Sequence, residues 1–330
     1  MIWVSKHGIG LAYVLVIAIV AFCLGTWLPI VGGPAFGLLL GLLISNTFGR
    51  SERAVAGILF CSKKILQWAI ILLGCGLSLT QIWETGSKSL LVMFSTLAVS
   101  FISAYTLGRL MKVPDNLNTL IAVGTGICGG SAIAAVSPII QAKNHEITYG
   151  ISIIFLLNLA AVLIFPAIGS WMHLSHEGFG LWAGTAIHDT SSAVAAGYLF
   201  SDEAGAYATI VKLTRTTLII PIVLMFAFIM SKRNKQTAPD YSIGKIFPWF
   251  IVWFIAASLL NTVGLISKDM VEVTNRLAKF MITMTLSAIG LSADLKSLIG
   301  TGFKPILLGI IVWVAVSATS LLMQAATNHW

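Results

Sequence analysis

The chain has 330 residues, of which 57% are hydrophobic and only 10% charged. Soluble domains carry about 25% charged residues, so this composition excludes a soluble domain and indicates an integral membrane protein. The net charge of +8 indicates basic cytoplasmic loops rather than binding to nucleic acid. The four cysteines form no Cys-x-x-Cys pair, so neither a zinc site nor a disulfide framework is indicated.

Apolar runs of about 20 residues predict an all-α membrane protein with about eleven transmembrane helices, in one polytopic domain covering residues 1–330. The first run is too long for a cleavable signal peptide. The segment at 51–62 is expected to lie at the membrane interface, and the loop at 231–245 is polar and basic. The expected spans are 9–31, 32–48, 63–83, 89–111, 116–141, 147–170, 179–200, 205–230, 246–266, 273–293 and 303–326.

The distribution of Lys and Arg predicts a cytoplasmic N-terminus, an outside C-terminus and a location in the bacterial inner membrane. In this orientation thirteen of these residues lie inside and three lie outside, namely Lys88, Lys143 and Lys268. That bias is what the positive-inside rule requires. A single re-entrant segment would invert everything after it and weaken the bias, so we expect every span to cross.

Two stretches of small residues, 124–135 and 184–196, match each other at an offset of sixty positions. Both lie within expected spans, where a glycine-rich break frees backbone groups that lipid cannot satisfy. Paired interrupted helices indicate the binding site of a transporter, although small residues four apart also allow close helix packing. Two motifs separated by two spans do not fit an inverted repeat. A shorter echo between Gly76 and Gly290 has a different offset, so one duplication cannot explain both.

Lys212 and Arg215 are three residues apart on one face of the expected span at 205–230. An ionisable group inside a membrane costs about 2.5–3.5 kcal/mol on insertion scales, so it is a functional candidate. An arginine fork beside a lysine point charge suits a small oxyanion. The alternative is that both side chains reach up to the membrane interface.

His188 and Asp189 lie in the middle of another expected span. We expect them to couple transport to H+ or Na+, because His titrates near neutrality and Asp189 can pair with Arg215 or Lys212 when the anion site is empty. The alternative is a static polar network that holds helices together.

A half-helix that begins near Gly129, Gly130 and Ser131 would present its N-terminus to an anion. Ser131 and its counterpart Ser191 are the two hydroxyls that we expect to contact the substrate. Asn158 is expected to join helices by a hydrogen bond. These positions complete the predicted site, which has no metal and no cofactor.

Three runs in order resemble a known family: Gly-Ile-Cys-Gly-Gly-Ser-Ala-Ile-Ala at 126–134, His-Asp-Thr-Ser-Ser-Ala at 188–193 and Lys-Leu-Thr-Arg at 212–215. They resemble the YeiH-like family of bacterial inner-membrane proteins, often called sulfate exporters. The resemblance implies grouping with antiporter-like and bile-acid-symporter-like carriers, which have two five-helix inverted repeats and broken, crossed helices. Sodium-coupled members of those folds often pair two acidic residues at the crossing, whereas here Asp189 stands alone.

The predicted function is a secondary transporter of a small inorganic or organic anion, such as sulfate, sulfite or an organosulfonate. Its other expected partners are a coupling ion and membrane lipid. An ion channel and a carrier of cations or organic solutes are the alternatives. An intramembrane enzyme would need Ser131 as nucleophile and His188 as base, and we do not expect one. The chain has no phosphate-binding Gly-x-x-x-x-Gly-Lys-Ser/Thr motif for ATP hydrolysis.

Overall fold

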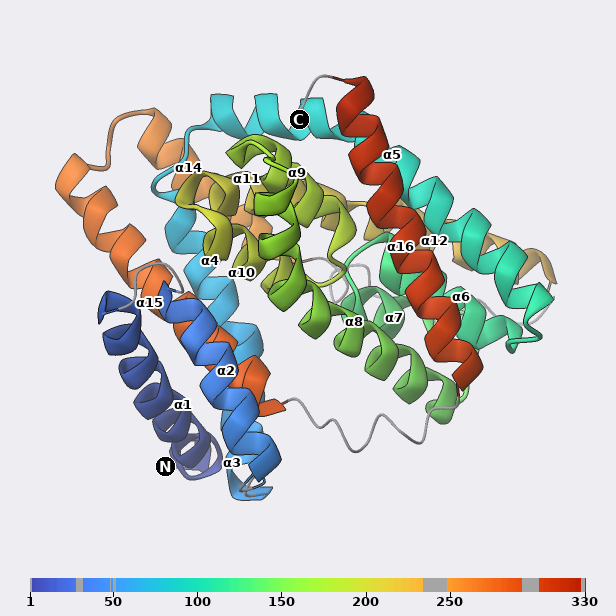
Figure 1. The fold of residues 1–330 in the computed structure, drawn as a ribbon, viewed down its shortest axis with the longest axis horizontal. Helices are drawn as coiled ribbons and strands as arrows, with labels where there is room; N and C mark the ends of the chain where they lie inside the picture. The colour runs from blue at the N-terminus through green and yellow to red at the C-terminus, as the bar shows by residue number, and fades with distance from the viewer. Residues whose placement is uncertain are drawn as a thin grey trace. The chain divides into compact units, whose positions relative to one another are not determined.

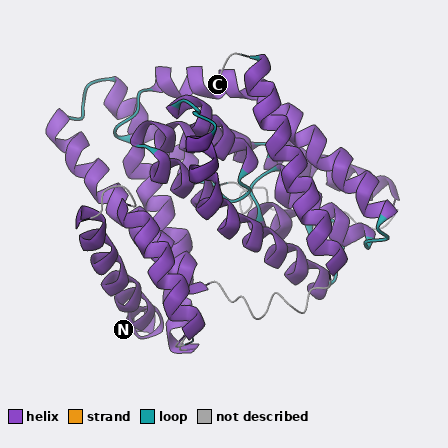
Figure 2. Cartoon of the chain, in the orientation of Figure 1, coloured by secondary structure: helices purple, strands orange, loops and turns teal. Residues whose placement is uncertain are grey.

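The computed structural model describes residues 2–27, 32–47, 49, 52–233, 248–292, 303–327 and 330. Within these ranges the regular secondary structure is entirely helical (Figure 2). The chain forms two compact units, one made of Met1–Trp83 and Trp249–Ser297, the other of Glu84–Pro248 and Leu298–Trp330 (Figure 1). Most of the expected basic loop, from 234 to 245, lies outside the described residues.

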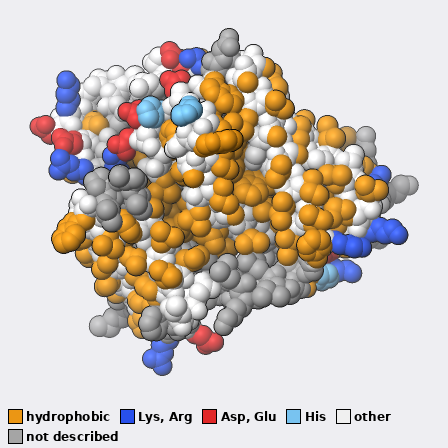
Figure 3. Space-filling view, in the orientation of Figure 1, with side chains coloured by type: hydrophobic (Ala, Val, Ile, Leu, Met, Phe, Trp, Pro, Cys, Tyr) orange, Lys and Arg blue, Asp and Glu red, His pale blue; other side chains and the backbone are white. Residues whose placement is uncertain are grey.

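Six helices in the described ranges are long and apolar enough to cross a membrane. Large apolar side chains are exposed on the surface of the protein, for example Trp171 at 80% and Leu110 at 78%. Hydrophobic side chains also cover much of the face shown in Figure 3. The chain is therefore an integral membrane protein. The six helices are His7–Trp27, Glu52–Gly74, Leu79–Leu110, Asn144–Trp171, Asp202–Met230 and Phe303–Ala326.

The first unit contains helices whose small residues allow the backbones to touch. A Cβ added at Gly41 would lie 2.4 Å from the Ser287 carbonyl oxygen, and one at Gly290 would lie 2.3 Å from the Leu38 carbonyl oxygen. These contacts join α2 to α15. The helices of this unit are α1 (Ile2–Trp27), α2 (Gly32–Thr47), α3 (Glu52–Phe60), the π-helix η1 (Cys61–Ile65), α4 (Leu66–Gly74), α14 (Phe250–Thr262) and α15 (Lys268–Ser292).

The expected interfacial helix at 51–62 and span at 63–83 are wrong. One helix runs through α3, η1 and α4, from Glu52 to Gly74. Cys61 and Ile65 are buried in its π-turn, while Lys63 and Lys64 point outward. The two lysines therefore lie on the exposed side of a continuous helix and do not mark its start.

The second unit contains the predicted site. Its helices are α5 (Leu79–Leu110, which starts in the first unit), α6 (Asp115–Gly126), α7 (Gly130–Val136), α8 (Asn144–Trp171), α9 (His176–Ala186), α10 (Thr190–Phe200), α11 (Asp202–Thr217), α12 (Ile219–Arg233) and α16 (Phe303–Ala326). Both small-residue stretches are interrupted helices, because three residues separate α6 from α7 and three residues separate α9 from α10.

Helices α6 and α7 form a hairpin, called the first hairpin, whose two ends lie together. Asn116 at the start of α6 donates a hydrogen bond from Nδ2 to Glu146 Oε2 at 3.4 Å. The same oxygen accepts the backbone N–H of Lys143, which follows α7, at 2.7 Å. A Cβ added at Gly150 of α8 would touch Leu120 of α6 and Ile133 of α7. Both arms therefore lie beside the first half of α8.

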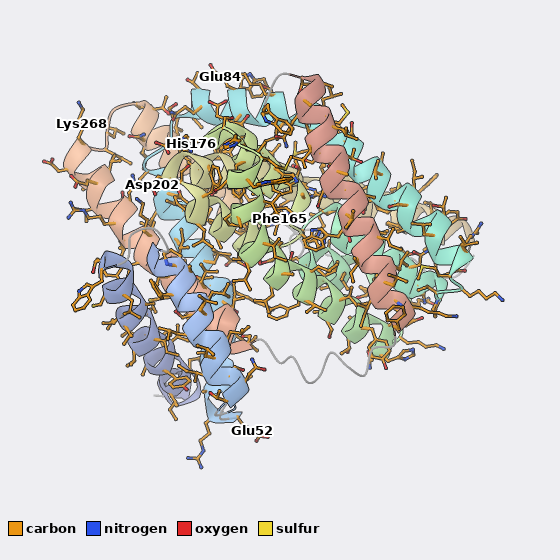
Figure 4. All side chains as sticks on the ribbon, viewed as in Figure 1. Glu52, Glu84, Phe165, His176, Asp202 and Lys268 are labelled. Carbon is orange, nitrogen blue, oxygen red and sulfur yellow. The ribbon has the colours of Figure 1, made fainter. Side chains whose placement is uncertain are left out.

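Helices α9 and α10 form the second hairpin. The rings of His176 and Phe200, at its two ends, have centroids 6.0 Å apart, and Phe179 stacks on Phe200 at 4.0 Å. Cβ atoms added at Gly180 and Gly197 would both approach the Ala204 carbonyl oxygen, at 2.8 and 3.0 Å. Figure 4 shows the labelled His176 near Asp202, the first residue of α11.

The two hairpins start from opposite ends of α8. This helix has 28 residues, a length of about 42 Å at 1.5 Å per residue, which is enough to cross a membrane. The first hairpin leads into its first turn and the second leaves from its last. Segments 116–141 and 179–200 are therefore re-entrant, and their expected crossings are wrong. Each re-entrant segment reverses the membrane topology of the chain that follows it, so the second reversal cancels the first. Only the loops at Lys143 and at 171–178 are therefore moved to the other side of the membrane. The orientation of the termini stays a prediction.

Candidate functional site

The tips of the two hairpins, residues 127–129 and 187–189, meet. Gly129 has φ +69, a left-handed conformation that side chains disfavour. A Cβ at this residue would also lie 3.3 Å from Ile154 Cγ2 and 3.6 Å from the Asp189 Cα. The backbone conformation favours glycine here, and a Cβ would also require the Ile154 side chain to shift slightly.

Lys212 and Arg215 on α11 bind both tips. Arg215 donates from Nη2 to the Thr125 carbonyl at 2.9 Å, from Nε to the Gly126 carbonyl at 2.9 Å, and from Nη1 to the Thr185 carbonyl. Lys212 Nζ donates to the Ile187 carbonyl at 2.5 Å and to the Ile127 carbonyl at 3.3 Å. Both side chains have 0% exposure, so neither reaches up to the membrane interface.

These contacts follow the internal sequence match. Thr125 and Thr185 are sixty residues apart, as are Ile127 and Ile187, and each pair of carbonyls shares one cation. Because the hairpins start from opposite ends of α8, their matched sequences run in opposite senses. The re-entrant geometry thus explains an inverted relationship between motifs that crossing spans would have excluded. The echo between Gly76 and Gly290 has no such account.

The cations compensate the carbonyl ends of α6 and α9. The last carbonyls of a helix have no partner within the helix, and they form the negative end of its dipole. The position is buried, and the two charged side chains supply the missing donors. Lys212 and Arg215 were predicted to bind substrate; the structure places them together at the junction, where they donate to the ends of both helices, and their contact with substrate stays a prediction.

Asp189 caps the second arm of its own hairpin and makes no ion pair. Its Oδ2 accepts the N–H groups of Ser191 at 3.1 Å and Ser192 at 3.4 Å, as well as the Ser191 hydroxyl. The Asp189 carboxylate is bonded to its own helix here rather than to Arg215 or Lys212, and its pairing with either cation during transport stays a prediction. The structure does form an ion pair elsewhere, between Arg276 and Glu272 on the exposed side of α15. An N-terminal cap satisfies two orphan donors of α10.

Asn158, in the middle of α8, holds the second tip. Its Oδ1 accepts the backbone N–H groups of His188 at 3.0 Å and Asp189 at 3.2 Å. These are donors that the break would otherwise leave without partners. Its expected role in joining helices by a hydrogen bond is therefore confirmed. In the sequence, the one sign that Asn158 belongs to the junction was its position near the middle of the expected span at 147–170.

The start of α7 differs from the start of α10. Its N-cap is Gly129, which has no side chain to accept the first N–H groups. A Cβ added at Gly130 would meet no atom within 4 Å, and Ser131 is exposed. Gly129, Gly130 and Ser131 are thus brought to the junction as predicted, on its accessible side, whereas Ser191 is buried against Asp189.

His188 is buried at 0% exposure, and neither ring nitrogen has a hydrogen-bond partner. Its ring centroid lies 6.5 Å from that of Trp313, in an edge arrangement. The nucleophile–base hydrogen bond that an enzyme would need between Ser131 and His188 is not formed. Within the described residues no group of three His, Cys, Asp or Glu side chains could hold a metal ion.

A polar stripe on α16, not identified from the sequence, packs along the second hairpin. Trp182 Nε1 donates to the Ser317 carbonyl at 3.3 Å, Thr185 and Ser320 share a hydroxyl hydrogen bond of 2.7 Å, and the Gln324 amide lies 3.0 Å from Ser320 Oγ. The available signal was the spacing of polar residues, since 317, 320 and 324 share one face of an otherwise apolar helix.

Comparisons with known proteins agree over nearly the whole chain. Residues 9–309 match the family described as conserved hypothetical protein 698. The chain is 40% identical over 339 residues to a UPF0324 membrane protein of Clostridium tetani, covering 98% of each. It is 43% identical over 332 residues to one of Streptococcus pneumoniae, again 98% of each. It is also 43% identical to one of Streptococcus agalactiae, covering 97% of this chain and 98% of that one.

Proposed function

We propose that this chain, which belongs to the UPF0324 family of membrane proteins, is a secondary transporter of a small anion. The YeiH-like family expected from the three motifs is this same family. The proposed site is the tip junction, made of residues 127–129 and 187–189 with Lys212 and Arg215. Like the broken helices of the antiporter-like and bile-acid-symporter-like carriers, it presents helix ends at membrane depth.

The charge balance at the junction carries the proposal. Two buried cations face a single carboxylate, Asp189, among the residues described there. The cations offset the carbonyl ends of α6 and α9, and Asp189 offsets the amide end of α10. The amide end of α7 has no side-chain cap. A small anion at Gly130 and Ser131 would supply the missing negative charge.

Each residue that was predicted to bind substrate has a part in this proposal. Lys212 and Arg215 supply positive potential from behind the tips. The backbone of Gly129 and Gly130 gives close access, and the Ser131 hydroxyl donates to the anion. Ser191 acts indirectly by fixing the Asp189 carboxylate. The Ser131 hydroxyl and the backbone N–H groups at the start of α7 are donors of short reach, which suits sulfate, sulfite or an organosulfonate better than a bulky solute.

The same geometry argues against a cation carrier. The backbone carbonyls that would coordinate a cation already accept from Lys212 and Arg215. For topology, we propose a cytoplasmic N-terminus in the bacterial inner membrane. The first hairpin then opens to the cytoplasm, which moves Lys143 inside and strengthens the positive-inside bias.

The test is anion-dependent thermal stabilisation of the purified protein at matched ionic strength. Sulfate, sulfite, thiosulfate, taurine and small carboxylates are compared with chloride. A ligand at about 100 times its dissociation constant adds about 2.7 kcal/mol to the free energy of unfolding. Stabilisation by one oxyanion supports the proposal, and stabilisation by none of them refutes it.

A pair of variants on α7 localises the site. Gly130→Val places a side chain in the open space beside the first turn and should abolish the anion effect. Ala134→Val is the matched control, because Ala134 is exposed one turn later on the same helix. Equal stabilisation of both variants by the anion would place the binding site elsewhere.

A further inference from the structure

Several buried polar atoms next to the tip junction have no hydrogen-bond partner. They are Thr125 Oγ1, both ring nitrogens of His188, Trp313 Nε1 and Ser317 Oγ. We call these four residues the inner polar cluster. Buried polar side-chain atoms in folded proteins are nearly always paired, so a group of unpaired ones indicates a missing partner.

The cluster is continuous in the fold. The His188 and Trp313 rings lie 6.5 Å apart, and Ser317 follows Trp313 by one turn on the same face of α16. The Thr125 carbonyl, which accepts from Arg215, also lies next to the His188 ring. Thr125 therefore belongs to the cluster through its hydroxyl and to the tip junction through its carbonyl.

The chemistry of these atoms suits water. The indole N–H of Trp313 can only donate, the two hydroxyls can donate or accept, and a neutral imidazole does one of each. A guest must therefore accept from Trp313 and also be able to donate to His188. Buried water makes about three hydrogen bonds to such groups. A metal cation is excluded by the indole N–H.

We propose that the inner polar cluster encloses an internal water site at which His188 takes up and releases a proton coupled to anion binding. This proposal rests on the proposed transport function, and it names the proton as the coupled ion.

Charges around His188 provide the coupling. Lys212 and Arg215 on α11 are the cations that face it, and Asp189 is its neighbour in the same tip. The other groups packed around it are neutral: Asn158 from α8, Trp313 and Ser317 from α16, and Thr125 with the Cys128 thiol from the first hairpin. The two cations repel a proton on the imidazole. A bound anion offsets that repulsion, so proton and anion bind together.

The closing experiment follows the fluorescence of Trp313, because a protonated imidazole quenches a neighbouring indole. The difference in emission between the wild-type protein and Trp313→Phe is titrated from about pH 8 down to the lowest pH at which the protein stays folded, because the two neighbouring cations oppose protonation of the imidazole. We expect one quenching step that moves to higher pH when sulfate or sulfite is added. His188→Gln should remove the step, and His188→Asn serves if that variant does not fold.

Each outcome has a defined meaning. No step in the wild-type protein, with or without anion, overturns the proton site even if an anion stabilises the protein. A step that survives in both His188 variants also overturns it. A step that no anion moves overturns the coupling and counts against the proposed function, while the proton site itself stands. Trp27→Phe, at an 86% exposed position, is the control for other indoles.

Discussion

Gly129 and Asp189 occupy matched positions in the two hairpins and face each other where the tips meet, with 3.6 Å between the Asp189 Cα and a Cβ built on Gly129. One is the N-cap of α7 and the other the N-cap of α10. The two matched residues therefore cap the second arms of the two hairpins. One supplies a carboxylate to its helix and the other supplies no side chain.

Gly129→Ala should destabilise the protein, because its backbone is left-handed and its surroundings are tight. For a residue with a Cβ this sparsely populated backbone conformation, with φ 69 and ψ −129, costs about 1–3 kcal/mol. Gly130→Ala should be neutral or slightly stabilising, since its Cβ meets open space. Thermal unfolding in detergent compares the two, and equal melting temperatures would contradict this account of Gly129.

Replacing Asp189 separates capping from charge. Asn caps a helix about as well as Asp, whereas Ala loses about 1 kcal/mol. Asp189→Asn should therefore keep the wild-type melting temperature while binding the anion more tightly, because it removes a nearby negative charge. It should also change the pH profile of transport. Asp189→Ala should lower the melting temperature, and an Asn variant as unstable as the Ala variant would refute the capping role.

Arg215→Ala should be strongly destabilising. It leaves three buried carbonyls without a donor, and each such group costs about 1–3 kcal/mol. The matched control is Arg276→Ala, which breaks an exposed ion pair worth about 1 kcal/mol or less. The yield of folded monodisperse protein and its unfolding temperature check the difference. Comparable behaviour of the two variants would show that Arg215 does not hold the tips.

The re-entrant hairpins predict which loops share a side of the membrane. Single cysteines at Asp115 and Lys143 should be labelled from one side, and cysteines at Glu177 and Asp202 from the other. The native cysteines are first replaced, and an impermeant maleimide is applied to cells and to inverted vesicles. Eleven crossing helices would instead put Asp115 opposite Lys143, and Glu177 opposite Asp202.

The hydroxyl pair between α9 and α16 should show a measurable coupling. Thr185 and Ser320 share a buried hydrogen bond of 2.7 Å. A double-mutant cycle with Thr185→Val and Ser320→Ala should give a coupling of about 0.6 kcal/mol, the average for such bonds in a membrane protein. Thr96→Val with Ser320→Ala is the control, because the Thr96 hydroxyl bonds only to its own helix. A coupling no larger than that control would contradict the contact.

Sequence reasoning located the junction through residue types that are costly in a membrane. Lys212, Arg215 and the glycines of 124–135 carry this signal, because lipid tolerates neither buried charge nor free backbone groups. No residue type in the sequence indicated whether the chain crosses the membrane or turns back after each helix break. Loop charges could not reveal it, because two hairpins reverse the topology twice and leave all basic loops but one on the same side.

The polar partners on α16 were missed for a different reason. A serine in a transmembrane helix bonds readily to its own backbone, so Ser317 and Ser320 look unremarkable one by one. Their role depends on which helix lies opposite, and that is decided by packing. The sequence alone showed only that the polar residues at 317, 320 and 324 share one face of the helix.

The five hydrogen bonds from Lys212 and Arg215 have a mechanical consequence. Each cation holds a carbonyl from both hairpins at once, and α11 is joined to the second hairpin by Ser201 alone. Sliding one tip past the other would expose five unpaired acceptors to an apolar interior. The two hairpins are therefore expected to move together as one rigid body. A bound anion would move with this body rather than pass from one tip to the other.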